Sequence, residues 1–395
     1  MSNEKNYIFE NNIPIAPLKI ASLEGCIDLA AKVDEHLVKF RQNDAEQLSK
    51  QSNNIQYRSY DNNSYLVKCK CTRFGTGEGK GHIIESIRGS DLYVIVDVTN
   101  YSLQYKVFGH MNHMSPDNHY QDLKRIIGIA ASTAHRVNVI MPFLYEGRQH
   151  KRTHRESLDC AIMLEELVDM GISNFITFDA HDPRISNSIP LNGFDNFTPP
   201  YQFIKALLQR EPNLQIDKDQ LIVISPDEGA MDRAVYLANN LGVDMGMFYK
   251  RRDYSTVING RNPIVAHEFL GSGIEGKTVI IIDDMISSGD SMLDTARELK
   301  EMKAGKVIIC TTFGLFTDGL DKFDEYHNNG YIDYVITTNL NYRTPKLLER
   351  PWYIEADMSQ FLATIINSMN HDVSLSSAMS PTAKIQKLIA KYRDK

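Results

Sequence analysis

Cysteine is scarce in this sequence, with five residues in a chain of 395. An odd and sparse set of thiols in a chain of this length excludes a disulfide framework and fits a reducing, cytoplasmic location. Cys69 and Cys71 form a Cys-x-Cys pair, which could be half of a zinc site. No second ligand pair stands at a suitable spacing, so we expect no zinc there.

Long apolar runs and an excess of basic residues are also missing. No run of about 18 apolar residues occurs, so we expect no transmembrane helix and no membrane partner. The first residues, MSNEKNYIFENN, are polar and acidic and lack the apolar stretch of a signal peptide. The net charge of −7 argues against a general nucleic-acid binder, although a local basic patch around a phosphate remains compatible with it.

Short apolar runs rich in β-branched residues alternate with helical periodicity. Such continuous runs suit parallel strands that are covered on both faces, and the alternation favours an α/β fold. Apolar residues at three- and four-residue spacing predict helices over 158–170 and 291–302. The expected strands are Leu92–Val96, Val137–Met141, Phe175–Phe178, Leu221–Ile224, Val279–Ile282, Lys306–Cys310 and Tyr334–Thr337.

The strand–helix pattern occurs twice, and Pro199-Pro200 marks the break between its two copies. We therefore expect an N-terminal domain over 14–200, a C-terminal domain over 201–369 and a tail over 370–395. The tail should end in a basic amphipathic helix, Thr382–Arg393. Two polar stretches are expected to be insertions in the first domain. The stretch near 40–64 should form a surface loop or hairpin, and the other lies near 110–120.

The segment Val279–Met292, VIIIDDMISSGDSM, carries the most specific chemistry. An apolar strand is expected to end at two acids, Asp283 and Asp284, before a Ser- and Gly-containing turn that opens a helix. A helix start offers unpaired N–H groups to a phosphate, and Gly289 lets the backbone approach closely. Carboxylates can bind sugar hydroxyls, directly or through a divalent cation. The combination indicates a sugar phosphate, although an ordinary capped strand-to-helix turn is the alternative.

This loop resembles the signature of phosphoribosyltransferase-fold proteins, in which the acids contact ribose and the following turn binds its 5-phosphate. The resemblance implies an α/β protein with two similar domains, each a mainly parallel sheet flanked by helices. In that family a third acid usually stands where Ser287 stands, and a small residue where Asp290 stands. The ribose-5-phosphate residues implied here are Asp283, Asp284, Ser287, Ser288, Gly289, Asp290 and Ser291.

Five further segments, in the expected order, make the chain similar to ribose-phosphate pyrophosphokinases from about Leu18 to about Asn370. Arg73–Glu78 resembles the family's Arg-Phe-x-x-x-Glu, whose Phe stacks on adenine and whose Glu contacts the nucleotide from a neighbouring subunit. This implies ATP contacts for Phe74, Thr76 and Glu78, although the family often has Asn or Asp where Thr76 stands. A glycine-rich loop beside a buried Phe is the structural alternative.

Tyr145–Arg152 resembles the family segment whose Arg and Gln contact ATP, which implies that role for Arg148 and Gln149. A guanidinium suits polyphosphate because it is permanently charged and binds oxyanions in a bidentate way. From His150 onward the residues depart from the family pattern, so we expect phosphate and ADP regulation to differ. A solvated basic face is the alternative reading.

The other three segments imply metal-binding and catalytic residues. Phe178–Asp182 resembles a family segment whose His binds the magnesium of Mg–ATP, here His181. Ser225–Gly229 matches Ser-Pro-Asp-x-Gly, whose Asp is a second metal-associated acid, here Asp227. Tyr249–Arg252 matches a mobile catalytic loop, which implies charge-stabilising roles for Lys250 and Arg252. A structural His and a solvated basic face are the alternatives.

The resemblance implies an enzyme that uses Mg²⁺, ATP and ribose 5-phosphate to make phosphoribosyl pyrophosphate and AMP. It also implies a homo-oligomer that is dimer-based and extends up to a hexamer. A pyrophosphokinase for another 5-substituted ribose and a non-catalytic regulatory homologue are the alternatives. A phosphoribosyltransferase ranks last, because the segments that resemble ATP-binding ones would have no use in it.

Overall fold

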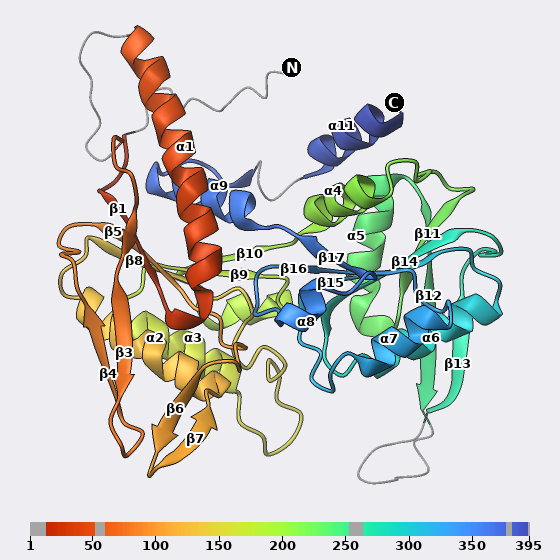
Figure 1. The fold of residues 1–395 in the computed structure, drawn as a ribbon, viewed down its shortest axis with the longest axis horizontal. Helices are drawn as coiled ribbons and strands as arrows, with labels where there is room; N and C mark the ends of the chain where they lie inside the picture. The colour runs from red at the N-terminus through yellow and green to blue at the C-terminus, as the bar shows by residue number, and fades with distance from the viewer. Residues whose placement is uncertain (1–12, 52–59, 253–263, 377–380, 394–395) are drawn as a thin grey trace. The chain divides into compact units, whose positions relative to one another are not determined.

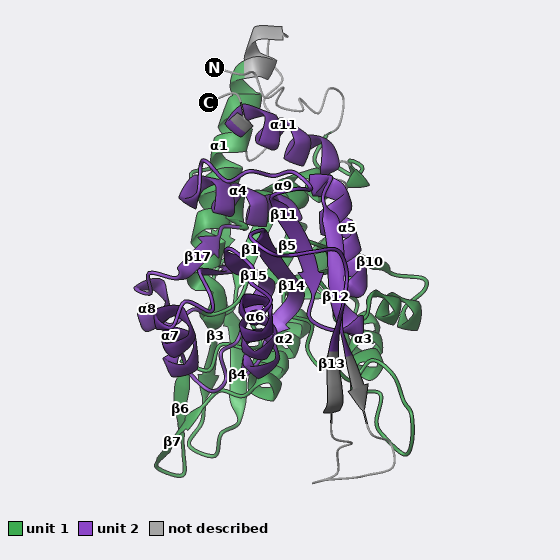
Figure 2. Cartoon of the chain, turned by 90° about the vertical axis from the view of Figure 1, so that its right-hand side faces the viewer, with its two compact units in different colours: residues 1–198, 340–342, 358–380 green, residues 199–339, 343–357, 381–395 purple. Residues whose placement is uncertain are grey.

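The computed structural model describes residues 13–51, 60–252, 264–376 and 381–393. The chain forms two compact units (Figure 2). Unit 1 comprises residues up to 198 together with 340–342 and 358–380, and unit 2 comprises 199–339, 343–357 and the residues from 381 onward. Each unit is an α/β structure around a mainly parallel sheet, as the sequence predicted.

Unit 1 contains a six-stranded sheet in which every pairing is parallel. Its central strand β5 is buried along its whole length. Side chains from α2 and α3 pack with the strands in one hydrophobic core. In spatial order the strands are β10 (Gly193–Phe197), β9 (Asn174–Phe178), β8 (Arg136–Ile140), β5 (Asp91–Ile95), β1 (Leu18–Ser22) and β2 (Leu66–Val67).

The helices of unit 1 lie along both faces of this sheet (Figure 1), which is the arrangement that continuous apolar strands require. Ser115 caps α2 by accepting a hydrogen bond from the N–H of Asn118, and Pro116 occupies its first turn. The helices are α1 (Ile27–Gln51), α2 (Pro116–Ala130), α3 (Asp159–Asp169) and α9 (Ser359–Asn370), with short 3₁₀ turns η1 (Glu24–Cys26) and η2 (Pro183–Ser188).

Two antiparallel hairpins extend unit 1 beyond its main sheet. Strand β3 (Cys69–Arg73) pairs with β4 (Gly79–Ile83), and β6 (Gln104–Val107) pairs with β7 (His110–His113). We predicted a surface loop or hairpin over 40–64. This prediction is wrong for residues 40–51, which form the last part of α1. The polar stretch 110–120 is strand β7 followed by the start of α2.

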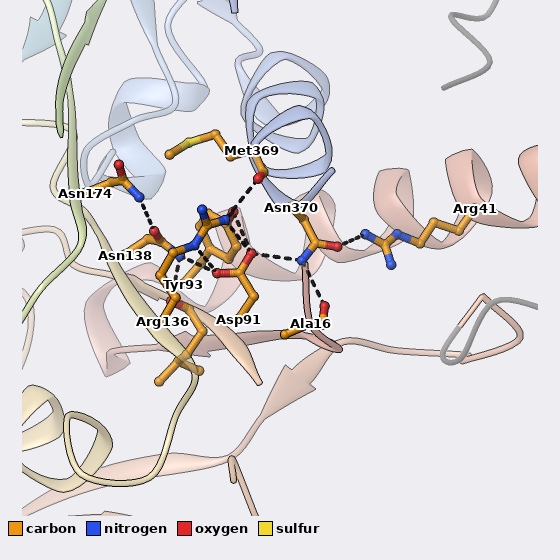
Figure 3. A network of polar contacts seen from close by, with 10 residues as sticks. Ala16, Arg41, Asp91, Tyr93, Arg136, Asn138, Asn174, Met369 and Asn370 are labelled. Atoms are coloured by element: carbon orange, nitrogen blue, oxygen red, sulfur yellow. Dashed lines mark hydrogen bonds and ion pairs between the residues drawn. The ribbon is translucent and has the colours of Figure 1, made fainter. Parts of the chain in front are cut away.

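A buried polar network explains why residues 358–380 belong to unit 1 (Figure 3). The carboxylate of Asp91 is fully buried and accepts two hydrogen bonds from Arg136, at 2.7 and 2.8 Å. Asn370 of α9 donates to the same carboxylate at 2.8 Å and accepts from Arg41 of α1. A buried charge is stable only when it is paired in this way, so the network holds α1, α9 and the sheet together. A single domain boundary near residue 200 would therefore place residues that this network joins in different domains.

Unit 2 contains a seven-stranded sheet that is parallel except for the pair β12–β13. Strand β15 is buried at every position. In spatial order the strands are β13 (Ile264–Leu270), β12 (Asp244–Arg252), β11 (Leu221–Ser225), β14 (Thr278–Ile286), β15 (Val307–Gly314), β16 (Tyr334–Thr338) and β17 (Tyr353–Ala356).

Separate hydrophobic cores cover the two faces of this sheet. Side chains of α4, α5 and α11 form one core with the strands, and those of α6 and α7 form the other with Trp352. The predicted C-terminal helix is present over Thr382–Arg393. The helices are α4 (Pro200–Arg210), η3 (Glu228–Ala230), α5 (Met231–Leu241), α6 (Asp290–Glu301), α7 (Asp321–Asn328), α8 (Pro345–Leu348) and α11 (Thr382–Arg393).

Among the described residues, no helix is both long enough and apolar enough to cross a bilayer.

Candidate functional site

The predicted phosphate loop lies in unit 2 between β14 and α6, next to strand β11. Strand β14 runs to Ile286, so the expectation that the strand ends before Asp283 is wrong. Its neighbour β15 continues alongside, with Met285 opposite Phe313 and Ile286 opposite Gly314. The two acids therefore lie within a paired strand, where the backbone is held more rigidly than in a turn.

Gly289 is required by the turn for two separate reasons. Its φ of 94° lies in the left-handed region, which side chains rarely tolerate. A Cβ added there would lie 2.4 Å from Cζ of Phe323, so no side chain fits without movement. Gly289 precedes the first residue of α6, and the first turn of a helix has N–H groups without helical partners. The backbone thus forms a close, positively polarised turn that suits an anion.

Asp290 does not leave an uncompensated carboxylate in this turn. Its Oδ1 accepts from Nζ of Lys322 at 2.7 Å, and Ser288 Oγ donates to its Oδ2 at 3.2 Å. The hydrogen bond from Lys322 is the main cause that lowers the pKa of Asp290. Asp290, which stands where the family usually has a small residue, is therefore ionised and paired with Lys322 of α7. The carbonyl oxygen of Ser287 accepts a hydrogen bond from the N–H of Thr317 at 3.0 Å, which fixes the backbone at Ser287.

Three carboxylates gather at the carboxyl ends of β11 and β14, which are neighbouring parallel strands. Burial, then the charge of Asp284 and that of Asp227, raise the pKa of Asp283 well above its ordinary value. Asp284 is 3% exposed, and its Oδ2 lies 3.9 Å from a guanidinium nitrogen of Arg233. The carboxyl ends of strands are where α/β sheets bind ligands.

This acidic cluster fits a magnesium ion in the nature of its donor atoms. Magnesium prefers oxygen ligands and keeps several waters, so one protein carboxylate plus substrate oxygens is sufficient. Oδ1 of Asp227 accepts a hydrogen bond from the N–H of Gly229 at 2.9 Å. Across the described residues, no three His, Cys, Asp or Glu side chains are arranged as a complete metal site.

The two predicted catalytic residues lie at the end of β12. Lys250 pairs through its backbone with His267, and Arg252 with Ile264, after an irregularity in the register between Arg251 and Arg252. The side chains of both Lys250 and Arg252 lie outside the described residues, as do residues 253–263 entirely. Their catalytic roles stay a prediction.

In unit 1, the predicted adenine-binding segment is the turn of the β3–β4 hairpin. The N–H of Phe74 donates to the carbonyl of Glu78 at 2.8 Å, which closes the turn. Phe74 is 55% exposed, so the alternative of a buried Phe is wrong. Thr76 Oγ1 donates to Glu78 Oε2 at 2.8 Å. The turn therefore presents an aromatic ring and a carboxylate to solvent.

The segments that carry Arg148 and His181 follow neighbouring parallel strands, β8 and β9. Arg148 is exposed, while Gln149 Nε2 donates to the carbonyl of Ser157 at 2.8 Å. His150, which departs from the family pattern, lies with its ring centroid 5.5 Å from that of His181. His150 Nε2 also lies 3.3 Å from Asp182 Oδ2. These contacts bring the two predicted ligand-bearing loops together.

Several residues at these places were not predicted from the sequence. Lys322 lies 32 positions after Asp290, and no local pattern marks it as the partner of that acid. Phe108, in the β6–β7 turn, donates its N–H to the carbonyl of Gly75 at 2.8 Å. The Phe-Gly pair at the turn was a possible signal, but it lies just before the stretch 110–120 that we interpreted as an insertion.

Comparisons with known proteins agree with this architecture. Residues 18–171 match the N-terminal domain of ribose phosphate pyrophosphokinase, and residues 201–341 match the phosphoribosyl transferase domain. The ribose-phosphate pyrophosphokinase of Aquifex aeolicus is 29% identical over 277 residues, which is 69% of this chain and 79% of the relative. That of Bacillus subtilis is 25% identical over 319 residues, covering 80% of this chain and 90% of the relative.

A solved structure shows the same fold. The crystal structure of phosphoribosylpyrophosphate synthetase from Mycobacterium smegmatis is similar with a TM-score of 0.69 and 20% sequence identity. The similarity covers 90% of this chain and 99% of that one. Both units therefore have the predicted phosphoribosyltransferase-type architecture.

Proposed function

This chain belongs to the ribose-phosphate pyrophosphokinase family, and we propose that it transfers the β,γ-pyrophosphoryl group of Mg–ATP to the 1-hydroxyl of ribose 5-phosphate. The products are phosphoribosyl pyrophosphate and AMP. The observation that carries this proposal is the turn after β14, where the backbone of Gly289 and the start of α6 suit a phosphate beside two acids.

The ribose side of the reaction is assigned to unit 2. Asp283 and Asp284 accept hydrogen bonds from the ribose hydroxyls, which orients the 1-hydroxyl for attack. Ser288, Ser291 and the backbone at Gly289 hold the 5-phosphate. The pairing of Asp290 with Lys322 supports this assignment, because the lysine compensates a carboxylate that would otherwise repel the anionic phosphate. Holding both reacting groups in position supplies much of the rate enhancement in reactions of this class.

The nucleotide side is assigned to residues of unit 1 and to the end of β12. Phe74 contacts the base, with Thr76 and Glu78 beside it, and Arg148 and Gln149 contact the polyphosphate. Attack by the ribose 1-hydroxyl oxygen on the β-phosphorus forms one P–O bond and breaks the bond between the β-phosphorus and the oxygen that bridges it to the α-phosphate. That oxygen leaves as part of AMP, and the hydroxyl proton is released to solvent. Lys250 and Arg252 stabilise the charge that develops on the transferring group. His181 of unit 1 and Asp227 of unit 2 are each proposed as magnesium-associated residues, and magnesium would supply further charge neutralisation.

The proposal includes a dimer-based homo-oligomer, up to a hexamer, and a cytoplasmic location. The oligomeric state follows from the family resemblance, and the location follows from the sparse cysteines.

Release of AMP from ATP and ribose 5-phosphate tests the proposed function. We expect AMP and phosphoribosyl pyrophosphate in equal amounts, and no AMP without ribose 5-phosphate or magnesium. AMP release only with another 5-substituted ribose would change the acceptor. No AMP release with any ribose would leave a regulatory homologue or a phosphoribosyltransferase. An assay with a nucleobase and phosphoribosyl pyrophosphate separates those two.

A further inference from the structure

The turns of two hairpins in unit 1 contact one another. The N–H of Phe108, in the β6–β7 turn, donates to the carbonyl of Gly75, in the β3–β4 turn, at 2.8 Å. A Cβ added to Gly77 would lie 3.2 Å from Cγ2 of Val107, so the backbone at Gly77 lies close to the Val107 side chain. The β6–β7 hairpin therefore supports the turn that carries Phe74.

The strands of the two hairpins are joined as well. The guanidinium of Arg73 lies 5.2 Å from the ring centroid of Tyr105 and donates two hydrogen bonds of 2.8 Å to the carboxylate of Asp122. Tyr105 in turn donates from its hydroxyl to Asn118 of α2 at 2.9 Å. Because Asp122 also belongs to α2, both hairpins are anchored to the same helix. The contacts with α2 therefore fix the position of the two turns relative to each other.

Phe108 is an unusual residue for its position. It occupies the first place of a two-residue turn with φ 47°, a left-handed conformation for which such turns prefer Asn, Asp or Gly. Its side chain is 77% exposed, so burial does not offset the strain. An exposed aromatic in a strained turn contributes little to folding, and such outliers often mark functional positions.

We propose that Phe108 is a second aromatic contact for the nucleotide base, in addition to Phe74. The inference rests on the proposed function, which supplies a nucleotide as substrate. Phe74 and Phe108 are exposed aromatics on turns that a backbone hydrogen bond holds together. A planar heterocycle gains by stacking on such rings or against their edges. The β6–β7 hairpin thus makes the base-binding surface of this chain larger than the Phe74 turn alone.

Replacement of Phe108 by Asn separates recognition from folding. Asn suits the left-handed turn better than Phe, so Phe108→Asn should unfold at the same temperature as the wild type or higher. We expect its affinity for ADP, measured by calorimetry, to fall about 5- to 20-fold, with a similar rise in KM for ATP. The KM for ribose 5-phosphate and the kcat should stay within about twofold. Phe108→Trp should keep the wild-type affinity.

Met111→Thr is the matched control, because Met111 is 55% exposed on the same hairpin. It should leave ADP affinity unchanged. Equal ADP affinity in Phe108→Asn and the wild type would overturn the proposal. So would loss of subunit association in sedimentation with unchanged ADP affinity, because that result would assign Phe108 to a contact with a second copy. A wild type that neither binds ADP nor releases AMP would defeat the proposed function itself, which is a distinguishable result.

Discussion

The candidate binding residues are arranged differently in the two units. In unit 2, the proposed ribose-phosphate residues fall within positions 283–291, on one strand, one turn and the start of one helix. In unit 1, the proposed nucleotide residues come from the β3–β4 turn, the loop after β8 and the loop after β9. A small anionic group can be bound largely by the backbone of one turn, whereas a base and a polyphosphate need side chains from several segments.

The comparison also concerns exposure. Asp284 and Gly289 are buried or nearly so, and Phe74, Phe108 and Arg148 are exposed. Changes at these two positions of unit 2 should therefore affect folding and binding together. Changes at the exposed positions of unit 1 should affect nucleotide binding with little effect on stability.

Lys250→Ala should have the largest effect and tests whether unit 2 supplies chemistry as well as ribose binding. Loss of a charge that stabilises the transferring group should lower turnover about 100- to 1,000-fold, with a much smaller effect on ribose 5-phosphate affinity. Steady-state AMP release measures both. Lys303→Ala, which removes an exposed lysine paired with Glu275, is the control and should be silent. Near-normal turnover in Lys250→Ala would remove the catalytic assignment.

Gly289→Ala tests whether the phosphate turn acts through its backbone. The left-handed φ costs a residue with a side chain about 1–2 kcal/mol, and the new Cβ would meet the ring of Phe323. We expect KM for ribose 5-phosphate to rise about tenfold or more and the unfolding temperature to fall. Gly273→Ala is the matched control, because a Cβ there meets no atom within 4 Å. Equal KM values in the two variants would argue against a backbone-built phosphate turn.

Asp283→Asn tests whether the acidic cluster is retained for function at the expense of stability. Its folded-state pKa is raised by burial and by Asp284 and Asp227. Above the unfolded pKa of about 4, the unfolded chain releases this proton more readily, so stability falls as pH rises toward the folded pKa. Asn removes that effect. At pH 7 the variant should melt about 2–4 °C higher while losing ribose affinity.

The control for this experiment is Asp294→Asn, which changes an exposed acid on α6 that is paired with Arg297. It should leave both the melting temperature and ribose affinity near the wild-type values. A lower melting temperature in Asp283→Asn would contradict this prediction, because it would show that the surrounding groups stabilise the carboxylate of Asp283.

His371→Gln should have the smallest effect on activity and tests the buried contacts that follow α9. His371 is 1% exposed, its Nδ1 bonds the carbonyl of Asn367 at 2.6 Å, and it contacts the hydroxyl of Tyr60. Burial lowers its pKa to about 4. The stability that it contributes is complete above the unfolded pKa of about 6.5 and is lost as pH falls toward 4.

The measurement is the free energy of unfolding between pH 7 and pH 4. The wild type should lose up to about 1.4 kcal/mol per pH unit from this group, and His371→Gln should lose less. Turnover at pH 7 should not change. His113→Gln, at an exposed position of β7, is the control and should follow the wild-type curve. A variant with the same pH dependence as the wild type would contradict a neutral, buried His371.

Local sequence patterns predicted seven strands of the two main sheets because the causes of those strands are local. Continuous β-branched runs identified β5, β8, β9, β11, β14, β15 and β16, and periodic apolar residues identified α3 and α6. The polar composition of residues 40–51 misled the interpretation, because a long helix can expose many polar side chains while its apolar face packs. The end of β14 was misplaced because its length is set by β15, which lies beyond any local signal.

The sequence by itself determined the α/β class, the strand–turn–helix with its glycine and acids, and the family. Each of these depends on residues that are neighbours along the chain. Only the tertiary structure decided that Lys322 neutralises Asp290, that α9 returns to the sheet of unit 1 through Asp91, and that Phe108 lies against the Phe74 turn. Those contacts join residues tens to hundreds of positions apart. Their partners are chosen by packing and by the need to pair buried charge, which no local spacing records.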